Sequence, residues 1–434
     1  MSKEQQKNYI LPIVMMILLF GMISFVTNLA APMGVVLKNQ FGASSSQGML
    51  GNLMNFIAYA VMGIPSGILL QKVGYKKTAL IGIAIGFIGV GIQFISGHTG
   101  QSSAFGVYLL GAFVAGLSMC LLNAVVNPML NTLGGGGKKG NQLIQVGGSF
   151  NSLVGAITPM FVGALIGEVT KAKITDVFPV MYIAMAVFAV VFVVLSLVRI
   201  PEPNAEKLSE PLGALMSGAL KFRHFILGAI GIFVYVGVEV GTPGTMNLFL
   251  ADPNAGGLDG TTAGFVAGTY WFLMLIGRLV GASIGGKVSA KTMLSVASAV
   301  GLVLVACAIF SSTGTHVNLP VLQTGATGAL SFGLTKVPIN AMFLVLVGLC
   351  TSIMWGSIFN LAVEGLGKYL AAASGLFMVL VCGGGILPVL QNYVVDVTGN
   401  NYMAGYWVII AGLAYLLYYA LVGSKNVNKD ISVD

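Results

Sequence analysis

A series of long apolar stretches constrains this chain more than any other feature. Crossing the roughly 30 Å hydrocarbon core of a bilayer takes about 20 apolar residues in a helix. Twelve stretches of that kind can be placed in the sequence, at 10–37, 46–71, 78–97, 105–133, 143–167, 175–198, 224–250, 260–286, 289–311, 337–362, 367–395 and 402–422. Because 56% of the 434 residues are hydrophobic and 8% are charged, the composition lies outside that of soluble domains. We therefore predict an all-α polytopic membrane protein whose first stretch is a retained span.

The basic residues between these spans predict the orientation of the chain. An even number of spans places both termini on one side, and loops rich in Lys and Arg stay in the cytoplasm. With cytoplasmic termini the inside segments hold Lys3, Lys7, Lys72, Lys76, Lys77, Lys138, Lys139, Arg199, Lys207, Lys221, Arg223, Lys287, Lys291, Lys368, Lys425 and Lys429. The outside loops hold Lys38, Lys171, Lys173 and Lys336. We predict a multi-pass protein of the cell inner membrane that contacts lipid and binds no nucleic acid, because its basic residues form no single patch.

Glu239 is the only formal charge in the apolar stretch 224–250. A carboxylate near the middle of a bilayer is costly unless it is paired, protonated or hydrated, so such a group commonly marks a transport pathway or a proton relay. Gly241, Pro243 and Gly244 follow it, and we expect them to loosen or break the helix beside a cavity. The alternative is a structural carboxylate that is hydrogen-bonded to a neighbouring helix.

The two halves of the chain contain an internal repeat. The stretch 63–80 aligns with 277–294 at a constant offset of 214 residues. The identical pairs are Gly63 and Gly277, Gly67 and Gly281, Lys77 and Lys291, Thr78 and Thr292, and Leu80 and Leu294. We predict an N-terminal six-helix bundle at 1–198, a cytoplasmic linker at 199–223, and a C-terminal six-helix bundle with a short cytoplasmic tail at 224–434. Two pseudo-symmetric, parallel six-helix repeats are similar to the organisation of the major facilitator superfamily.

Several motifs make this resemblance more specific. The pattern Gly67, Gln71, Lys72, Gly74, Lys76 and Lys77 resembles the superfamily signature between the second and third spans, with Gln71 where an Asp is usual. The stretches 116–134, 149–156, 235–240, 277–278 and 352–367 together resemble the fucose/galactose/glucose:H⁺ symporter family, and the likeness covers essentially the whole chain. It implies a monomeric transporter that imports a monosaccharide, a hexose such as glucose, galactose, mannose, fucose or an N-acetylhexosamine.

The resemblance also bears on coupling to a cation. The family's fucose permease has essential acidic residues in its first and fourth spans, whereas the matching positions here are Asn28 and Asn123, which cannot titrate. Glu239 lies in a YVGVEV stretch similar to glucose and galactose members of the family, and it is the remaining membrane-embedded candidate. Three alternatives stay open: H⁺ coupling through Glu239, Na⁺ coupling with Glu239 and nearby oxygens as ligands, or an uncoupled facilitator.

Sugar recognition needs neutral hydrogen-bond donors and acceptors together with an aromatic face. Amide and tryptophan side chains inside the spans supply both. With Glu239, the candidate substrate-binding residues are Asn28, Asn123, Asn127, Gln145, Asn151, Asn247, Trp271, Trp355 and Asn360. Asn123 and Asn127 are four residues apart and share a helix face, as a cavity lining requires. The alternatives are amides that serve as packing contacts between helices and tryptophans of an interfacial belt.

Four further residues are candidates for gating or structural roles. Arg278 lies inside a span, about ten residues and roughly 15 Å along the helix before Lys287. We expect it to pair with a carbonyl or a carboxylate at a cytoplasmic helix junction, in a structural or gating role rather than as a substrate contact. Gln71, Lys72 and Lys76 belong to the signature-like pattern. Gln71 in place of the usual Asp should weaken the charge latch that this pattern supplies in the superfamily.

Enzyme classes find little support in the sequence. It has no HExxH or GxSxG motif, and the glycine-rich stretch 134–140 lacks the P-loop spacing. Cys120, Cys307, Cys350 and Cys382 lie in apolar runs without CxxC spacing, so we predict no disulfide framework, no metal site and no cofactor. A secondary transporter that works by alternating access is therefore the predicted function. A drug/H⁺ antiporter of the same fold is the more distant alternative, and the amide-rich residue set disfavours it.

Overall fold

The computed structural model describes residues 9–133, 137–166, 171–200, 212–284, 288–324, 330–428 and 431. Its α-helices are α2 (Ile10–Phe41), α3 (Ser45–Gly48), α4 (Leu50–Ser96), α5 (Gln101–Leu133), α6 (Gly137–Ile166), α7 (Phe178–Leu197), α8 (Leu212–Ala219), α9 (Arg223–Ala251), α10 (Gly260–Ile284), α11 (Ala290–Phe310), α12 (Ile339–Thr351), α13 (Met354–Val363), α14 (Leu370–Leu380), α15 (Gly383–Val397) and α16 (Tyr402–Tyr418). The remaining elements are the 3₁₀ helices η1 (Ile174–Val177) and η2 (Gly367–Tyr369), the π-helical turn η3 (Tyr419–Gly423), and the strands β1 (His316–Thr324) and β2 (Leu330–Pro338).

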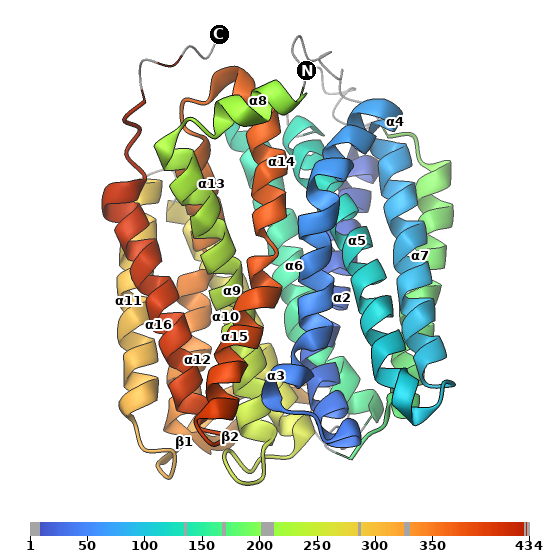
Figure 1. Ribbon diagram of the computed structural model, residues 1–434, viewed down its shortest axis with the longest axis vertical. Coiled ribbons are helices and arrows are strands. Elements are labelled where there is room, and N and C mark those ends of the chain that lie inside the picture. Colours follow the sequence, from blue (N-terminus) through green and yellow to red (C-terminus); the bar gives the residue numbers. More distant parts are fainter. Residues whose placement is uncertain are drawn as a thin grey trace.

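Within these described residues, 12 helical segments are long and apolar enough to cross a membrane, which confirms the predicted number of spans. α4 carries the second and third spans, α12 with α13 forms the tenth, and α14 with α15 forms the eleventh. The first six spans gather on the right of Figure 1 and the last six on the left. The predicted all-α fold of two six-helix bundles is therefore confirmed.

The two ends of the molecule carry different elements. What we call the terminal end is the one where α4 turns and α8 lies, and α2 begins and α16 ends there. What we call the distal end is the opposite one, which carries α3 and the strands.

The turn between the second and third spans explains part of the signature-like pattern. Gly74 has φ 82° and ψ 174° inside α4, and only glycine takes such a conformation without strain. Lys76 follows, and its Nζ donates to the backbone oxygens of Ser196 and Val198, each at 2.8 Å. These carbonyls lie at the C-terminal end of α7, where a cation complements the helix dipole. Lys76 therefore ties the third span to the sixth within one bundle.

Two spans of the second bundle are broken along their length. In the tenth span α12 ends at Thr351 and α13 begins at Met354, and in the eleventh α14 ends at Leu380 and α15 begins at Gly383. Gly383 has no room for a side chain, because an added Cβ would overlap the backbone oxygen of Phe233 on α9. The broken eleventh span thus packs directly against the backbone of the seventh.

The seventh span, by contrast, does not break where we expected it to break. α9 runs from Arg223 to Ala251 with Pro243 inside it. A proline removes one hydrogen bond from the helix ladder, and the helix continues here because a side chain of the neighbouring span supplies the missing donor, as described below. The helix interruptions described above belong to the tenth and eleventh spans instead.

A β-hairpin at the distal end, between α11 and α12, was not predicted. β1 and β2 are antiparallel, with His316 opposite Pro338. The hairpin packs on α10, where the Leu322 backbone N–H donates to the Thr269 hydroxyl at 3.3 Å and Val321 is buried. It adds a small sheet outside the helical bundles.

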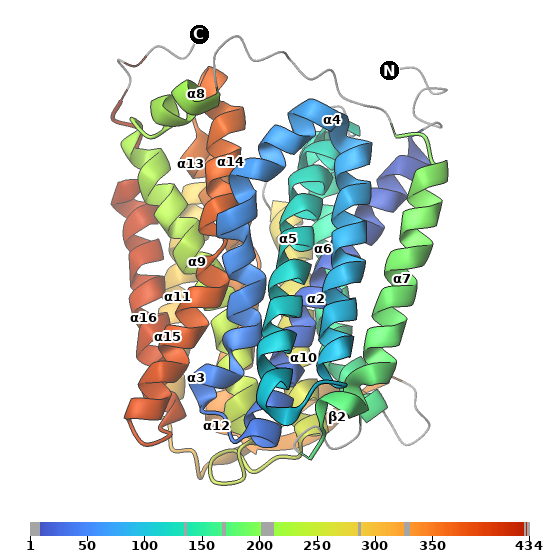
Figure 2. The ribbon, with the colours of Figure 1, turned by 45° about the vertical axis from the view of Figure 1, so that its right-hand side comes forward.

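The two bundles meet along three sets of helices. α6 packs on α10, α4 packs on α14 and α15, and α2 packs on α9. Figure 2 shows α4 running beside α14 and α15. These contacts bring α2, α9 and α10 together around one cavity.

Candidate functional site

A small cavity of mixed polar and apolar lining lies between the two bundles. Its lining residues are Thr27, Asn28, Met49, Asn52, Val240, Pro243, Gly244, Ala267 and Trp271. The volume open to the centres of water molecules is about 20 Å³, which is room for about one water. Three neutral polar side chains, those of Thr27, Asn28 and Asn52, meet the Trp271 indole and five smaller or apolar residues in this narrow space.

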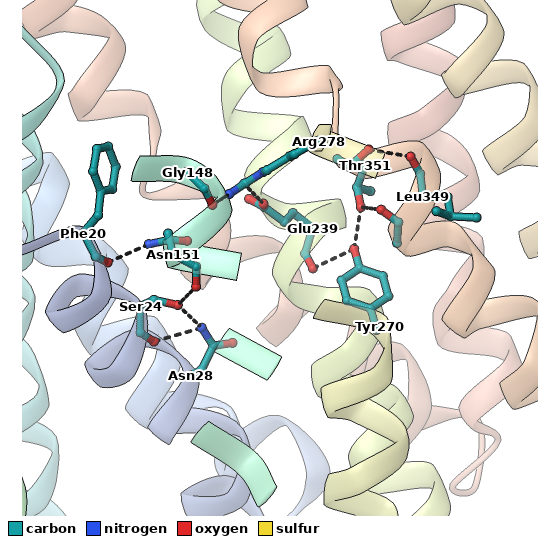
Figure 3. Close-up of polar contacts among 12 residues, drawn as sticks. Phe20, Ser24, Asn28, Gly148, Asn151, Glu239, Tyr270, Arg278, Leu349 and Thr351 are labelled. Carbon is teal, nitrogen blue, oxygen red and sulfur yellow. Dashed lines mark hydrogen bonds and ion pairs between the residues drawn. The ribbon is translucent and has the colours of Figure 1, made fainter. Parts of the chain in front are cut away.

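The predicted residues Asn28 and Asn151 belong to one hydrogen-bonded string between α2 and α6 (Figure 3). Asn28 Nδ2 donates to the backbone oxygen and to the hydroxyl of Ser24, at 2.9 and 3.1 Å. The Ser24 hydroxyl donates to the backbone oxygen of Asn151 at 2.6 Å, and Asn151 Nδ2 donates to that of Phe20 at 3.0 Å. Asn28 faces the cavity, whereas Asn151 joins the fifth span to the first.

Asn123 and Asn127 lie one turn apart on α5, and both are half-buried. Asn123 Nδ2 donates to the Tyr59 hydroxyl at 2.7 Å, and Asn127 Nδ2 donates to the backbone oxygen of Asn123 at 3.0 Å. The Tyr59 ring stacks on Phe56 with the centroids 5.9 Å apart. Asn123 therefore links the fourth span to the second, and the small cavity between the bundles is lined by other residues.

Glu239 and Arg278, both inside spans, face each other across α9 and α10. Arg278 Nη2 lies 3.5 Å from Glu239 Oε1, and each side chain is 13% exposed. Arg278 Nη1 also donates to the backbone oxygen of Gly148 on α6, so one guanidinium contacts both bundles (Figure 3). Arg278 thus has both kinds of partner that we expected for it, but they lie inside α9 and α6 and not at a helix junction. Removing one member of such a shielded pair leaves an uncompensated buried charge.

The backbone carbonyl of Glu239 is the one that Pro243, four residues later, leaves without a helical donor. The Tyr270 hydroxyl on α10 supplies that donor at 3.1 Å. The same hydroxyl lies 2.9 Å from Thr351 Oγ1, at the point where the tenth span breaks. The turn that carries Glu239 is therefore tied through Tyr270 to the eighth and tenth spans (Figure 3).

The two predicted tryptophans differ in their surroundings. Trp271 lines the cavity and packs edge-on against Tyr270, with the ring centroids 5.4 Å apart. Trp355 on α13 is half-buried, and its ring centroid lies 6.2 Å from that of Tyr235 and 6.4 Å from that of Phe377. Trp271 offers an aromatic surface to the cavity, whereas Trp355 belongs to an aromatic cluster one turn from Glu239.

The remaining predicted residues lie away from the cavity or outside the described side chains. Asn247 is buried in α9, and its Oδ1 has no hydrogen-bond partner among the described residues. Asn360 on α13 and Lys72 on α4 are exposed. Gln71 and Gln145 lie on α4 and α6, and their side chains are outside the described part of the structure.

Three residues at the site were missed by the sequence analysis: Thr27, Asn52 and Tyr270. Asn52 lines the cavity, and its Nδ2 donates across the bundle interface to the backbone oxygen of Gly384 at 2.7 Å. The signal for Asn52 was present, because it is an amide inside an apolar span, the criterion that selected Asn28. Tyr270 carried no such signal, because the carbonyl it satisfies lies on another helix.

Comparison with known proteins gives a consistent family. A sequence model described as Major Facilitator Superfamily matches residues 13–389. A glucose/galactose transporter of Brucella abortus (strain 2308) is 30% identical over 433 residues, which cover 98% of this chain and 96% of the relative. The L-fucose-proton symporter of Escherichia coli (strain K12) is 21% identical over 420 residues, covering 91% of this chain and 89% of that protein.

Solved structures agree on the fold. The crystal structure of the E. coli fucose:proton symporter FucP in the outward conformation matches with a TM-score of 0.69 and 18% identity, covering 96% of this chain and 100% of that chain. The crystal structure of a mutant of the nucleoside transporter NupG matches with a TM-score of 0.63 and 15% identity, covering 93% of this chain and 98% of that one.

Proposed function

The chain belongs to the major facilitator superfamily and, within it, to the group of glucose/galactose transporters and fucose-proton symporters, and on that basis we propose that it imports a hexose by alternating access. In such transporters two helical bundles rock around a substrate site between them. Residues 1–198 and 224–434 are the proposed moving bundles, and 199–223 is the proposed linker. Glucose, galactose, mannose, fucose and N-acetylhexosamines are the substrates to test.

The observation that carries this proposal is the cavity lined by Asn28, Asn52 and Trp271. An amide offers two donors and one acceptor, which suits sugar hydroxyls, and an indole face suits the apolar side of a sugar ring. A cavity with room for about one water is too narrow for a hexose, so the bundles must part on one side before the sugar enters. The other lining residues except Thr27 are apolar, so a drug/H⁺ antiporter remains the alternative for the test.

Further amides are proposed to join the substrate contacts when the bundles part. Asn123 and Asn127 are the first of these, because both are half-buried and already present donors on one face of α5. In the second bundle, we propose that the Trp355 indole joins the substrate contacts in the same way. We propose packing roles for Asn151 and Asn247, because the first is bonded to α2 and the second is buried away from the cavity lining.

We propose that Glu239 couples the sugar to H⁺. Protonation removes the charge that holds Arg278 at 3.5 Å and leaves the guanidinium free to change its contact with Gly148 on α6. Three residues further along α6, Asn151 begins the string that reaches Asn28 at the cavity. The protonation state of Glu239 is thereby linked to the packing of the two bundles and to the sugar site.

The same geometry speaks against Na⁺ on this carboxylate. Sodium prefers several oxygen ligands and no adjacent cation, and the Arg278 guanidinium already occupies the Oε1 side of Glu239. A sodium ion bound to the Glu239 carboxylate would lie beside the Arg278 guanidinium, and the two positive charges would repel each other in this shielded site. Na⁺ coupling and uncoupled transport are therefore outcomes that the test must separate from H⁺ coupling.

The proposed location is the bacterial inner membrane, with both termini in the cytoplasm and a single chain as the transporting unit. The lysines and arginines of the loops support this orientation. It makes the terminal end the cytoplasmic one and the distal end the outer one.

The experiment that tests this function is radiolabelled hexose uptake into proteoliposomes under an imposed H⁺ gradient and, separately, an imposed Na⁺ gradient. Wild type should accumulate sugar above equilibrium only with the H⁺ gradient, and Glu239→Gln should only equilibrate it. Glu364→Gln is the matched control, because Glu364 has an exposed side chain at the end of α13 and should couple normally.

Other results would change the assignment. Accumulation driven by Na⁺ alone would make the protein a sodium symporter, and equilibration by wild type under both gradients would make it a facilitator with a structural glutamate. Uptake of lipophilic cations without uptake of any hexose would favour the antiporter.

A further inference from the structure

Four side chains from both bundles meet at the distal end of the molecule. Lys38 lies in the last turn of α2, in the first bundle. Asp252 follows α9, Tyr402 begins α16 and Asp396 lies near the end of α15, all in the second bundle. None of the four belongs to the cavity or to the Glu239 site.

Lys38, Asp252 and Tyr402 form a closed set of contacts. Lys38 Nζ lies 3.6 Å from Asp252 Oδ2 and donates to the Tyr402 hydroxyl at 2.9 Å. That hydroxyl donates in turn to Asp252 Oδ2 at 2.9 Å. The charged side chains are 22% and 13% exposed, so water and salt screen this pair less than they screen an exposed surface pair.

Asp396 makes a second contact between the bundles beside the first. Its two carboxylate oxygens accept the backbone N–H groups of Ser45 and Ser46, each at 3.0 Å. These residues open α3, in the connection between the first and second spans. Hydrogen bonds of this kind to a carboxylate are stronger than neutral ones. Lys38 Nζ also donates to Ser45 Oγ at 3.1 Å, so the two sets form one network.

The position of the network relative to the cavity indicates what it controls. Met49 follows α3 directly, lines the cavity and is 3% exposed, so the network lies between the cavity and the distal surface. Its contacts between the bundles cross from α2 or the α3 connection to the ends of α9, α15 and α16. A rocking motion that opens the cavity at the distal end must separate these partners.

We propose that Lys38, Asp252, Tyr402 and Asp396 form an outer latch that holds the distal end closed and sets the balance between the inward-open and outward-open states. The latch rests on the alternating access and the orientation proposed above. Its residues are positioning residues, because they act on the substrate site through the bundle ends and do not touch the cavity. Breaking the latch shifts the population of the sugar-free protein toward the outward-open state. External sugar binds to that state, so its apparent affinity rises with the outward-open fraction.

The test is the rate at which a membrane-impermeant maleimide labels Met49→Cys from outside intact cells. A cysteine at this position reacts only when the distal end opens. Protein without Met49→Cys measures the background labelling of the native cysteines. We expect this background to be low, because Cys120, Cys350 and Cys382 are buried and Cys307 is half-buried. Added to Met49→Cys, Asp252→Asn and Asp396→Asn should each raise the labelling rate about tenfold, because each weakens charged hydrogen bonds that exist only in the closed arrangement.

Asp259→Asn is the matched control. Its carboxylate accepts hydrogen bonds from the backbone and the hydroxyl of Thr262, within the second bundle, and asparagine caps a helix as well as aspartate does. The labelling rate should not change in this variant. Tyr402→Phe should raise the rate by a smaller factor and is the fallback if a charge-removing variant does not accumulate in the membrane.

Two results overturn the latch: unchanged labelling in both Asp252→Asn and Asp396→Asn, or an equal increase in Asp259→Asn. The readout needs no sugar, so it separates the latch from the proposed function. If no hexose is transported but the two variants still label faster, the latch stands and the proposed substrate falls.

Discussion

The hydroxyl of Tyr270 donates to the backbone carbonyl of Glu239 at 3.1 Å, at the position where Pro243 leaves the helix without its own donor. One side chain of the eighth span thereby completes the hydrogen bonding of the seventh, and α9 stays continuous. The carbonyl and the carboxylate of Glu239 are held by Tyr270 and by Arg278, which both lie on α10. The proposed coupling residue is therefore fixed to one neighbouring helix through its main chain and its side chain.

This relationship predicts a coupling between Tyr270 and Pro243. Tyr270→Phe should lower the stability of the purified protein by about 1–3 kcal/mol, because it leaves a buried carbonyl without a donor. Pro243→Ala restores a backbone N–H to the helix, so Tyr270→Phe should cost less in that background. Thermal unfolding in detergent of the four proteins of this cycle measures the effect. Equal costs in both backgrounds would show that the hydroxyl does not serve this carbonyl.

The Glu239 and Arg278 pair predicts a second non-additive effect. Arg278→Gln leaves the Glu239 carboxylate shielded and unpaired, so it should destabilise the protein by about 3–5 kcal/mol. Adding Glu239→Gln removes that charge and should recover much of the stability. The double variant should still fail to accumulate sugar against a gradient. Melting temperatures and gradient-driven uptake measure the two properties separately, and a double variant as unstable as Arg278→Gln alone would contradict the pairing.

The cavity lining predicts the residues that set sugar affinity. Asn52→Leu and Trp271→Ala should each raise the KM for hexose uptake about tenfold, because each removes a contact worth about 1–1.5 kcal/mol. Asn55→Leu is the comparison for Asn52→Leu, since Asn55 is a buried amide of the same helix outside the cavity lining. Uptake at varied external sugar concentration measures KM and maximal rate. The proposed site would be misplaced if Asn55→Leu changed the KM more than Asn52→Leu did.

The contact between the second and fourth spans predicts a stability effect within the first bundle. A Cβ added at Gly116 on α5 would overlap the backbone oxygen of Asn55 on α4. Gly116→Ala should therefore lower stability by about 1–3 kcal/mol through overpacking. Gly106→Ala on the same helix meets nothing within 4 Å and should be neutral or slightly stabilising. Thermal unfolding of both variants tests the difference, which should have this sign whatever the substrate is.

Much of the fold could be predicted from the sequence, because a span is encoded locally. About 20 consecutive apolar residues predict a membrane helix whatever surrounds them, and the number of spans and the all-α bundles were found as predicted. The same local reasoning singled out Glu239 and Arg278 as charges in apolar surroundings and Asn28 as an amide that faces the cavity.

The tertiary structure decided what the sequence could not, namely which groups become partners. Pro243 looked like a helix break because its missing N–H is a local property, whereas the donor that replaces it comes from Tyr270, 31 residues from Glu239. Arg278 and Gly148 are 130 residues apart, and Ser45 and Asp396 are 351 residues apart. Such contacts depend on how the two bundles pack, because a buried polar group takes whichever partner the packed helices bring within reach. The spans therefore follow from the sequence alone, whereas the contacts of the proposed coupling network and of the proposed outer latch follow from how the spans pack.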